Sequence, residues 1–282
     1  MQKPIQKITK KTILFAAIVL LSSFTVVRYV FDRNDVIFSL IVDSLKQLHY
    51  SPGKLDDKFS EKVFDQYLNT DLNKKFLLQS DVDELTKYKF DIDDQIANQR
   101  HDFYKASRSI IDKRIAEKES WSAEILSKPL DYNAEEEYEF DWKKIPYAKT
   151  EAELKNEWRK MLKYQVLFRL DEALNKQEKA KEKNDTAVKI LSYDTLEVDA
   201  RRKTLKFQQD WFKRLKKVTD RDKFSEFANA VTSIYDPHTQ YFAPKDKKRF
   251  DQGMSGQFEG IGARLQSKDG ILKVSEIIAG SP

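Results

Sequence analysis

The sequence contains no cysteine, and this absence excludes disulfides, thiolate metal sites, a cysteine nucleophile and a lipidated cysteine. Glycine and proline are also scarce, with seven of each in 282 residues. Six of the seven glycines fall within residues 253–282, so this segment must differ from the rest. Hydrophobic residues make up 40% of the chain and charged residues 34%. Such a composition, poor in helix breakers, predicts long and solvated helices before residue 253.

The net charge of +5 does not indicate a nucleic-acid-binding protein. Four lysines lie within residues 1–23, where there is no acidic residue. Without these four of the 51 basic residues, 47 remain against 46 acidic ones. A nucleic-acid-binding domain normally keeps a basic face in its folded part. We therefore expect no nucleic-acid partner.

Residues 1–27 are predicted to be a signal peptide or a membrane anchor. The basic start is followed by an uncharged, largely apolar stretch over residues 12–27, which is typical of an export signal. Sixteen residues are short for a membrane span, and the cleavage site is poor, so both alternatives stay open, with a buried core helix as a third. In the first two cases the lysines remain cytoplasmic and the rest of the chain crosses the membrane.

From residue 35 to about residue 234 the hydrophobic residues recur at helical spacing. Thr150 and Glu153 are predicted to form a capping box at one helix start. Breaks are expected at residues 51–53 and 128–129 and in the acidic loop 131–141. Each helix is expected to bury one apolar face. These faces are Phe59, Val63, Tyr67 and Leu68; Ile92, Ile96, Phe103, Ile110 and Ile111 on one longer helix; Leu154, Trp158, Leu162, Val166 and Leu170; Phe207, Trp211, Leu215 and Val218; and Phe224, Phe227, Ala228, Val231, Ile234 and Tyr235.

The helical segment shows no catalytic or metal-binding pattern. His49, His101 and His238 are scattered and lack the spacing of metal ligands, so they are predicted to be surface or capping histidines. No serine lies in a Gly-x-Ser-x-Gly motif. We expect no metal and no cofactor.

The pattern changes after Tyr235. Asp236-Pro237 is predicted to end the helix, because proline and the residue before it disfavour helical backbone. Beyond Gly253 the hydrophobic period becomes two, and the Asp-Gly pair at residues 269–270 predicts a tight hairpin turn. A β-rich domain is therefore expected to begin here.

The glycines before the first strand predict a binding loop. Gly260-Ile261-Gly262 can bring backbone N–H groups close to an anion, such as the terminal carboxylate of a peptide. Ala263 and Leu265 would then offer the strand edge to which the peptide adds. Tight-turn geometry explains the two glycines nearly as well.

Several stretches resemble C-terminal-processing (tail-specific) periplasmic serine proteases. Residues 258–265 (FEGIGARL) and 277–282 (IIAGSP) resemble the opening of their PDZ domain, and residues 235–244 (YDPHTQYFAP) resemble the segment before it. Residues 55–68, 76–82 and 151–164 resemble the N-terminal helical domain of the large periplasmic branch. The expected organisation is a leader (1–27), a helical N-terminal domain (28–246) and the first strands of a truncated PDZ domain (247–282). The expected fold class is mainly α.

The resemblance implies a function for the longer protein. Such proteases cleave with a serine activated by a lysine, and their PDZ domain captures substrate tails; Gly260, Ile261, Gly262, Ala263 and Leu265 match the tail-binding positions. The Ser/Lys domain is not within this sequence, so no catalytic residue is assigned and the chain alone is expected to be inactive. Expected partners are C-terminal tails of envelope proteins, a lipoprotein adaptor, and the inner membrane through residues 12–27 if the leader is retained. The expected location is the periplasm or the periplasmic face of the inner membrane. The alternative is a membrane-tethered, non-catalytic PDZ adaptor or holdase.

Overall fold

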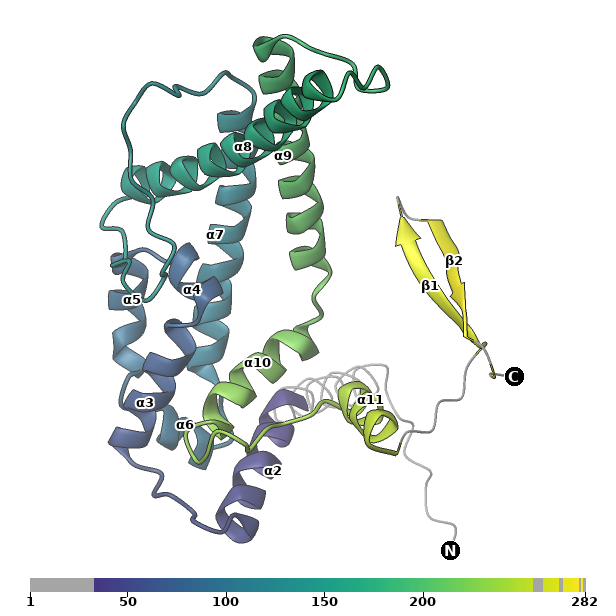
Figure 1. Ribbon diagram of the computed structural model, residues 1–282. Coiled ribbons are helices and arrows are strands. Elements are labelled where there is room, and N and C mark those ends of the chain that lie inside the picture. The colour runs from purple at the N-terminus through teal and green to yellow at the C-terminus, as the bar shows by residue number, and fades with distance from the viewer. Residues whose placement is uncertain (1–32, 256–260, 269–270, 279, 281–282) are drawn as a thin grey trace, which may run out of the picture. The chain divides into compact units, whose positions relative to one another are not determined.

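The computed structural model describes residues 33–255, 261–268, 271–278 and 280 (Figure 1). It divides into two compact units: a helical unit that ends at Tyr241 and a second unit that begins at Phe242. The leader predicted at residues 1–27 lies outside the described residues. Within the described ranges, no helix is long and apolar enough to cross a membrane.

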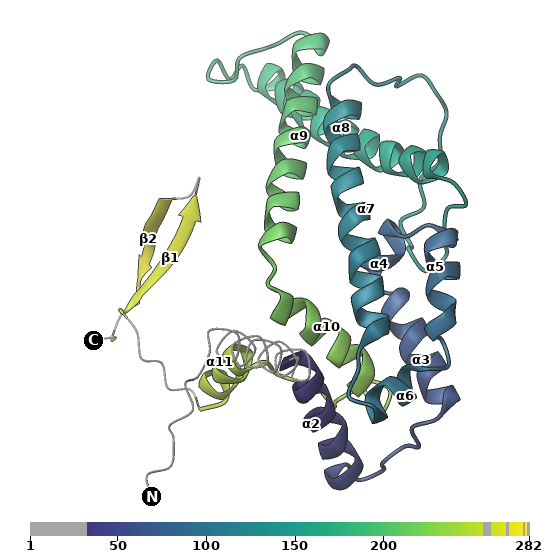
Figure 2. The same ribbon diagram turned by 180° about the vertical axis from the view of Figure 1, so that it is seen from behind.

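Three long helices, α7, α8 and α9, form one end of the helical unit. They pack on one another, and α8 lies across α7 and α9 in both views (Figures 1 and 2). Shorter helices cover the other end, where α3 packs against α6 and α10. The elements are α2 (Arg33–Leu48), α3 (Asp57–Leu68), α4 (Asp71–Phe76), α5 (Gln79–Leu85), the 3-10 turn η1 (Thr86–Tyr88), α6 (Ile92–Ala97), α7 (Asp102–Leu126), α8 (Glu151–Glu182), α9 (Tyr193–Lys217) and α10 (Asp220–Thr232).

Short polar side chains set the start of most of these helices. Thr150 Oγ1 accepts a hydrogen bond from the N–H of Glu153 (3.2 Å), as the sequence predicted. The Glu153 carboxylate accepts from the N–H of Lys149 (2.7 Å), so it caps one residue earlier than in a standard capping box. Each such cap satisfies a backbone donor that has no partner inside the helix. Equivalent caps are provided by Asp56, Thr70, Ser192 and Thr219.

An aromatic cluster joins four helices at the lower end of the unit. The ring of Phe227 (α10) lies 5.3 Å, centroid to centroid, from the rings of Phe38 (α2), Tyr67 (α3) and Tyr104 (α7). All four residues are buried. Such ring pairs add to the free energy gained from burying apolar area, so this cluster fixes how the short helices pack on α7.

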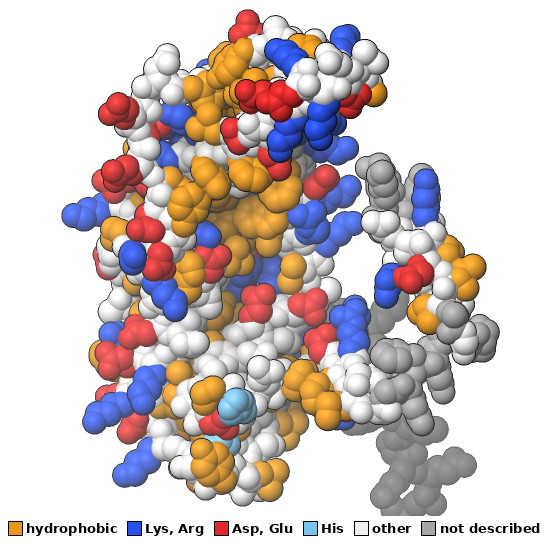
Figure 3. Space-filling view, in the orientation of Figure 1, with side chains coloured by type: hydrophobic (Ala, Val, Ile, Leu, Met, Phe, Trp, Pro, Cys, Tyr) orange, Lys and Arg blue, Asp and Glu red, His pale blue; other side chains and the backbone are white. Residues whose placement is uncertain are grey.

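A second aromatic cluster joins α4, α8 and α9. Trp211 stacks on Phe76 (6.0 Å) and on Trp158 (6.1 Å), and Phe212 lies behind them, fully buried. On the face shown in Figure 3, hydrophobic side chains gather in a hollow where α8 and α9 lie over α4 and α7, with charged side chains around it. This part of the unit is therefore a concave, partly apolar surface.

The predicted buried faces of α3, α8 and α10 are confirmed, and that of α9 is confirmed in part, since Trp211 and Leu215 pack against the core but Phe207 lies outside it. Phe207 is 45% exposed, and the side that faces the core includes Thr204, Gln208 and Phe212. Thr204 bonds to the carbonyl of Ala200 in its own helix (2.9 Å), and Gln208 bonds to Gln165 Oε1 (2.9 Å). The buried side of α9 thus contains polar residues, which a search for apolar residues passes over, and Gln208 Oε1 is buried there without a hydrogen-bond partner.

The single longer helix expected through residues 92–111 is two helices. Gln99 has a φ of 54°, in the left-handed region, which ends α6. Gln95 holds the junction, because its side-chain oxygen accepts from the N–H of Phe103 at the start of α7 (2.9 Å). Phe103 is fully buried, so the hydrophobic spacing continues across the break.

The second unit contains α11 (Pro244–Ser255) and an antiparallel hairpin of β1 (Ala263–Lys268) and β2 (Ile271–Ile277). The predicted strands are confirmed, and so is the fold class. The predicted helix end is displaced: α10 ends at Thr232, before Asp236-Pro237. Asp236 instead stabilises the following turn, where its carboxylate accepts from the N–H of His238 and the hydroxyl of Thr239, both at 2.7 Å. Residues 245–250, most of which are charged, belong to α11.

Candidate functional site

The predicted tail-binding loop lies at the start of the hairpin. Gly260 is outside the described residues. Ile261 is 70% exposed, and Gly262 has a φ of 65°, a backbone conformation that favours glycine. Ala263 is the first residue of β1, and Leu265 is 48% exposed. The structure therefore places four of the five predicted site residues consecutively, or nearly so, along one loop and strand.

Hydrogen bonds show which edge of β1 is paired. The carbonyl of Gly262 accepts from the N–H of Ile278 (2.8 Å), and the carbonyl of Arg264 accepts from Ser275 Oγ (3.0 Å). Both carbonyls therefore face β2. Because backbone groups alternate in direction along a strand, those of Ala263 face the opposite edge. Among the described residues the sheet has only these two strands, so a third strand could pair at that edge.

A β-bulge separates Arg264 from Leu265. Arg264 pairs with Glu276, and the two side chains form an ion pair, whereas Leu265 is opposite Val274. A bulge increases the local twist and changes the direction of the following side chains. The extra residue of this bulge, Ser275, is on β2, so the bulge lies at the paired edge of β1 and not at its free edge.

Ser122 and Lys118, one turn apart on α7, have the residue types of a serine–lysine catalytic pair. The Ser122 hydroxyl donates to the carbonyl of Lys118 (2.7 Å) and accepts from Trp158 Nε1 (2.8 Å). The Lys118 ammonium donates to the carbonyl of Lys75. The hydroxyl and the amine are thus engaged elsewhere, and they lack the hydrogen bond through which a base activates a nucleophile.

The histidines hold α2 against the rest of the helical unit. His101 bonds to Asp35 of α2, and His49 Nε2 lies 3.3 Å from Asp236 Oδ2. The His101 and His49 side chains are 1% and 6% exposed, so the prediction of surface positions is wrong for both, although His101 does occupy the N-cap position of α7. His238 is exposed, as predicted. Within the described residues, no three His, Asp or Glu side chains converge as metal ligands.

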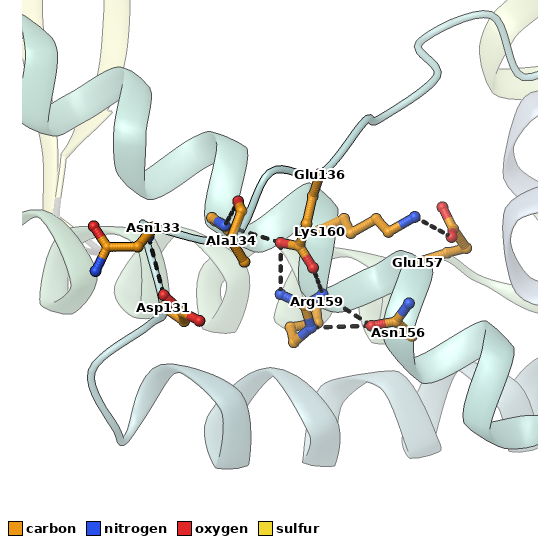
Figure 4. A network of polar contacts seen from close by, with 9 residues as sticks. Asp131, Asn133, Ala134, Glu136, Asn156, Glu157, Arg159 and Lys160 are labelled. Atoms are coloured by element: carbon orange, nitrogen blue, oxygen red, sulfur yellow. Dashed lines mark hydrogen bonds and ion pairs between the residues drawn. The ribbon is translucent and has the colours of Figure 1, made fainter.

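Glu136 fixes the segment between α7 and α8 onto α8 (Figure 4). Its carboxylate accepts from Lys163 Nζ (2.9 Å) and from both terminal nitrogens of Arg159, one of them at 3.1 Å. Lys163 also donates to the carbonyl of Ala134 (3.1 Å). These hydrogen bonds, first from Arg159 and then from Lys163, lower the pKa of Glu136 to about 2. Sequence reasoning missed this cluster, because Glu136 lies 23 residues before Arg159 and 27 before Lys163.

Within the described residues, the helical unit is followed in the sequence by a two-stranded hairpin. Residues 41–245 match the family described as the tail specific protease N-terminal domain. The chain belongs to this family.

Curated relatives agree. The tail-specific protease of Haemophilus influenzae is 30% identical over 244 residues, which are 84% of this chain and 32% of that protein. The carboxy-terminal processing protease CtpA of Bacillus subtilis is 39% identical over 66 residues, 23% of this chain and 14% of that protein. A probable CtpA-like serine protease of Staphylococcus aureus is 38% identical over 68 residues, again 23% and 14%. The chain thus spans about a third or less of the length of these relatives.

Proposed function

We propose that this chain is the N-terminal scaffold and part of the tail-binding region of an exported C-terminal-processing serine endopeptidase that acts on envelope proteins. The match of residues 41–245 to the tail-specific protease family carries this proposal. The exported location is supported by the basic and apolar pattern of residues 1–27. Catalysis would come from a Ser/Lys pair outside this sequence. A lipoprotein adaptor and the inner membrane are the proposed partners beside substrate tails.

The proposed tail-binding mode is strand addition to β1. The peptide would pair with the edge that the backbone of Ala263 faces, and its terminal carboxylate would bind N–H groups of the loop at Gly260, Ile261 and Gly262. Leu265 and Ile261 are exposed beside that edge and can contact the last side chain of the peptide. Main-chain hydrogen bonds would give affinity, and these apolar contacts would favour tails that end in an apolar residue.

The nucleotide sequence after codon 282 is the first test. A following mixed α/β domain with a Ser/Lys pair supports the protease. A stop codon soon after a completed PDZ domain instead supports the membrane-tethered, non-catalytic adaptor or holdase.

Peptide binding tests the loop directly, in a version of the protein that extends through the complete predicted PDZ domain. A fluorescent peptide with a free C-terminus should bind, and the same peptide with a C-terminal amide should bind at least about tenfold more weakly. Gly262→Val should abolish binding, because a β-branched residue is strained at a φ of 65°. Gly253→Val is the matched control, since a Cβ at Gly253 in α11 meets no atom within 4 Å. Unchanged affinity of Gly262→Val would refute the loop assignment.

A further inference from the structure

A pocket in the helical unit is formed by α4, α7, α8 and the segment that connects α7 with α8. Its cavity volume is about 50 Å3 and it is partly open to solvent, so it can take one small apolar group while the rest of a ligand stays outside. Most of its wall is apolar and is made by Tyr138, Ile145, Pro146, Leu154, Trp158 and Met161. The pocket therefore suits an apolar group.

A buried charged side chain forms part of the same wall. Lys118 of α7 lines the pocket and is 2% exposed. Its ammonium group lies 4.4 Å from the centroid of the Trp158 ring and 5.0 Å from that of Phe76. One of its three N–H bonds points to the carbonyl of Lys75, so donor capacity remains for a ligand.

The charges around the pocket do not balance. Lys74 and Lys75 also line it, and Glu157 is the one acidic residue in its wall. Lys75 pairs with Asp71 (2.7 Å) and Glu157 with Lys160 (2.9 Å). Within residues 33–255, neither Lys74 nor Lys118 forms an ion pair with a carboxylate; their ammonium groups rest on aromatic rings. Two lysines without a carboxylate partner thus line an apolar pocket.

This arrangement is costly for the free protein. Burial, and then the nearby charge of Lys75, lower the pKa of Lys118 to about 7. An aromatic face attracts a cation but cannot neutralise it. Buried charges in proteins are normally paired, and a bound carboxylate would supply the missing partner.

We propose that this pocket binds a ligand that carries a carboxylate next to an apolar group, with the carboxylate paired to Lys118 and the apolar group against Trp158 and Ile145. Two sources have this chemistry: the last residue of a polypeptide chain and a free apolar carboxylic acid. The site is separate from the hairpin and does not rest on the proposed tail binding at Gly262.

Calorimetric titration of the full chain with matched small probes tests the proposal. 3-Phenylpropanoic acid should bind with a roughly millimolar Kd, as expected for a ligand of this size. 3-Phenylpropanamide has the same apolar group without the charge and should bind at least about tenfold more weakly. This comparison uses the unaltered protein, so it remains decisive even if a variant fails to fold. Equal binding of acid and amide, or no binding of the acid, would overturn the proposal.

Two variants locate the binding site. Lys118→Met should remove the preference for the acid, leaving acid and amide with equal affinity. Lys113→Met is the matched control, because Lys113 is on the same helix but its side chain is 67% exposed. It should keep the full preference. If both variants keep it, the carboxylate binds elsewhere and the pocket is not the site.

A second pair of probes distinguishes the two sources. N-acetyl-alanyl-leucine has the end of a peptide chain, and 4-methylpentanoic acid has the same branched apolar group on a free acid. Tighter binding of the peptide acid supports a polypeptide end as the ligand, and equal or tighter binding of the free acid supports a small carboxylic acid. Gly262→Val should leave either result unchanged. Failure of the hairpin to bind tails would therefore not affect this test.

Discussion

The ammonium nitrogen of Lys118 lies 4.4 Å from the centroid of the Trp158 ring. Trp158 is held in place, because its ring N–H donates to Ser122 Oγ (2.8 Å) and its face stacks on Trp211. Lys118 and Ser122 are both on α7, so one helix provides the cation and also the acceptor that orients the ring. This contact therefore joins α7 and α8 through an amine that is shielded from water.

Replacement of Lys118 by methionine should change how stability depends on pH. Because the pKa of Lys118 is lowered to about 7 from 10.5, the unfolded chain binds more protons than the folded chain between these values, and the stability of the wild type rises with pH there. At about 1.4 kcal/mol per pKa unit, the whole effect is at most about 5 kcal/mol. Urea unfolding at several pH values from 7 to 10 should show a shallower rise for Lys118→Met.

The methionine variant also leaves the carbonyl of Lys75 without this donor, which shifts its stability by about the same amount at every pH. The slope against pH is therefore the informative quantity. Lys113→Met, on the exposed side of α7, should keep the wild-type slope. A Lys118→Met slope that equals the wild-type slope would show that Lys118 is charged in the folded protein up to its ordinary pKa.

Loss of the Asp81 charge should destabilise the helical unit strongly. Asp81 accepts two hydrogen bonds from Arg114, both at 2.8 Å, and one from the N–H of Leu78 (2.8 Å). Both charged side chains are 9% exposed. Asp81→Asn would leave a buried guanidinium without its main partner, so we expect a loss of about 3–5 kcal/mol in the free energy of unfolding, measured with urea.

An exposed ion pair provides the comparison. Glu124→Gln removes the partner of Lys155, where the side chains are 58% and 34% exposed, and should lower the free energy of unfolding far less than Asp81→Asn does. The double variant Asp81→Asn/Arg114→Met should recover part of the loss, since it removes both buried charges. A cost of Asp81→Asn that is no larger than that of Glu124→Gln would contradict the buried-pair assignment.

Much of the helical unit could be predicted from the sequence because its faces are apolar and evenly spaced. Leu154, Trp158 and Leu162 follow this rule, and all three are buried. The prediction was wrong where burial depends on long-range hydrogen bonds, as at Gln208 in α9, or where a left-handed residue such as Gln99 interrupts a continuous pattern. Neither feature has a local signature in the chain.

The candidate sites also differ in whether a local sequence pattern could predict them. The hairpin and the glycine before it follow from local pattern, and Gly262 has the conformation that glycine permits. The pocket at Lys118 depends on Lys75 and Trp158, which are 43 residues before it and 40 after it in the sequence. A lysine in a charge-rich helix gives no indication that it is buried. Only the packing of α4 and α8 on α7 reveals this site.

The corrected orientation of α9 can be tested with two phenylalanines. Phe212 is fully buried and Phe207 is 45% exposed. Phe212→Ala should cost about 3–5 kcal/mol in the free energy of unfolding, because it leaves a cavity in the core. Phe207→Ala should cost less than about 1 kcal/mol. Urea unfolding of both variants measures the difference. Equal losses of stability would show that Phe207 is as buried as Phe212, as the apolar spacing predicts.

The contact between Glu136 and α8 should contribute to stability above pH 4.5 and be lost in acid. Since the pKa of Glu136 is lowered to about 2 from 4.5, the folded chain binds fewer protons than the unfolded chain in this interval, so the contribution falls as pH falls through it. Glu136→Gln should cost about 1–2 kcal/mol at pH 7, a value that allows for partial screening by solvent. In urea unfolding, the difference in the free energy of unfolding between wild type and Glu136→Gln should become smaller as the pH falls from 4.5 to 2.

Glu137→Gln is the control, because the neighbouring Glu137 is exposed and forms no ion pair within the described part of the chain. It should behave as wild type at both ends of the pH range. Amide hydrogen exchange provides a second, local measurement: Glu136→Gln should accelerate exchange in residues 131–149, since Arg159 and Lys163 then hold a neutral side chain. If the exchange rates of residues 131–149 are unchanged, and the stability difference between wild type and Glu136→Gln does not depend on pH, then Glu136 does not fix this segment to α8.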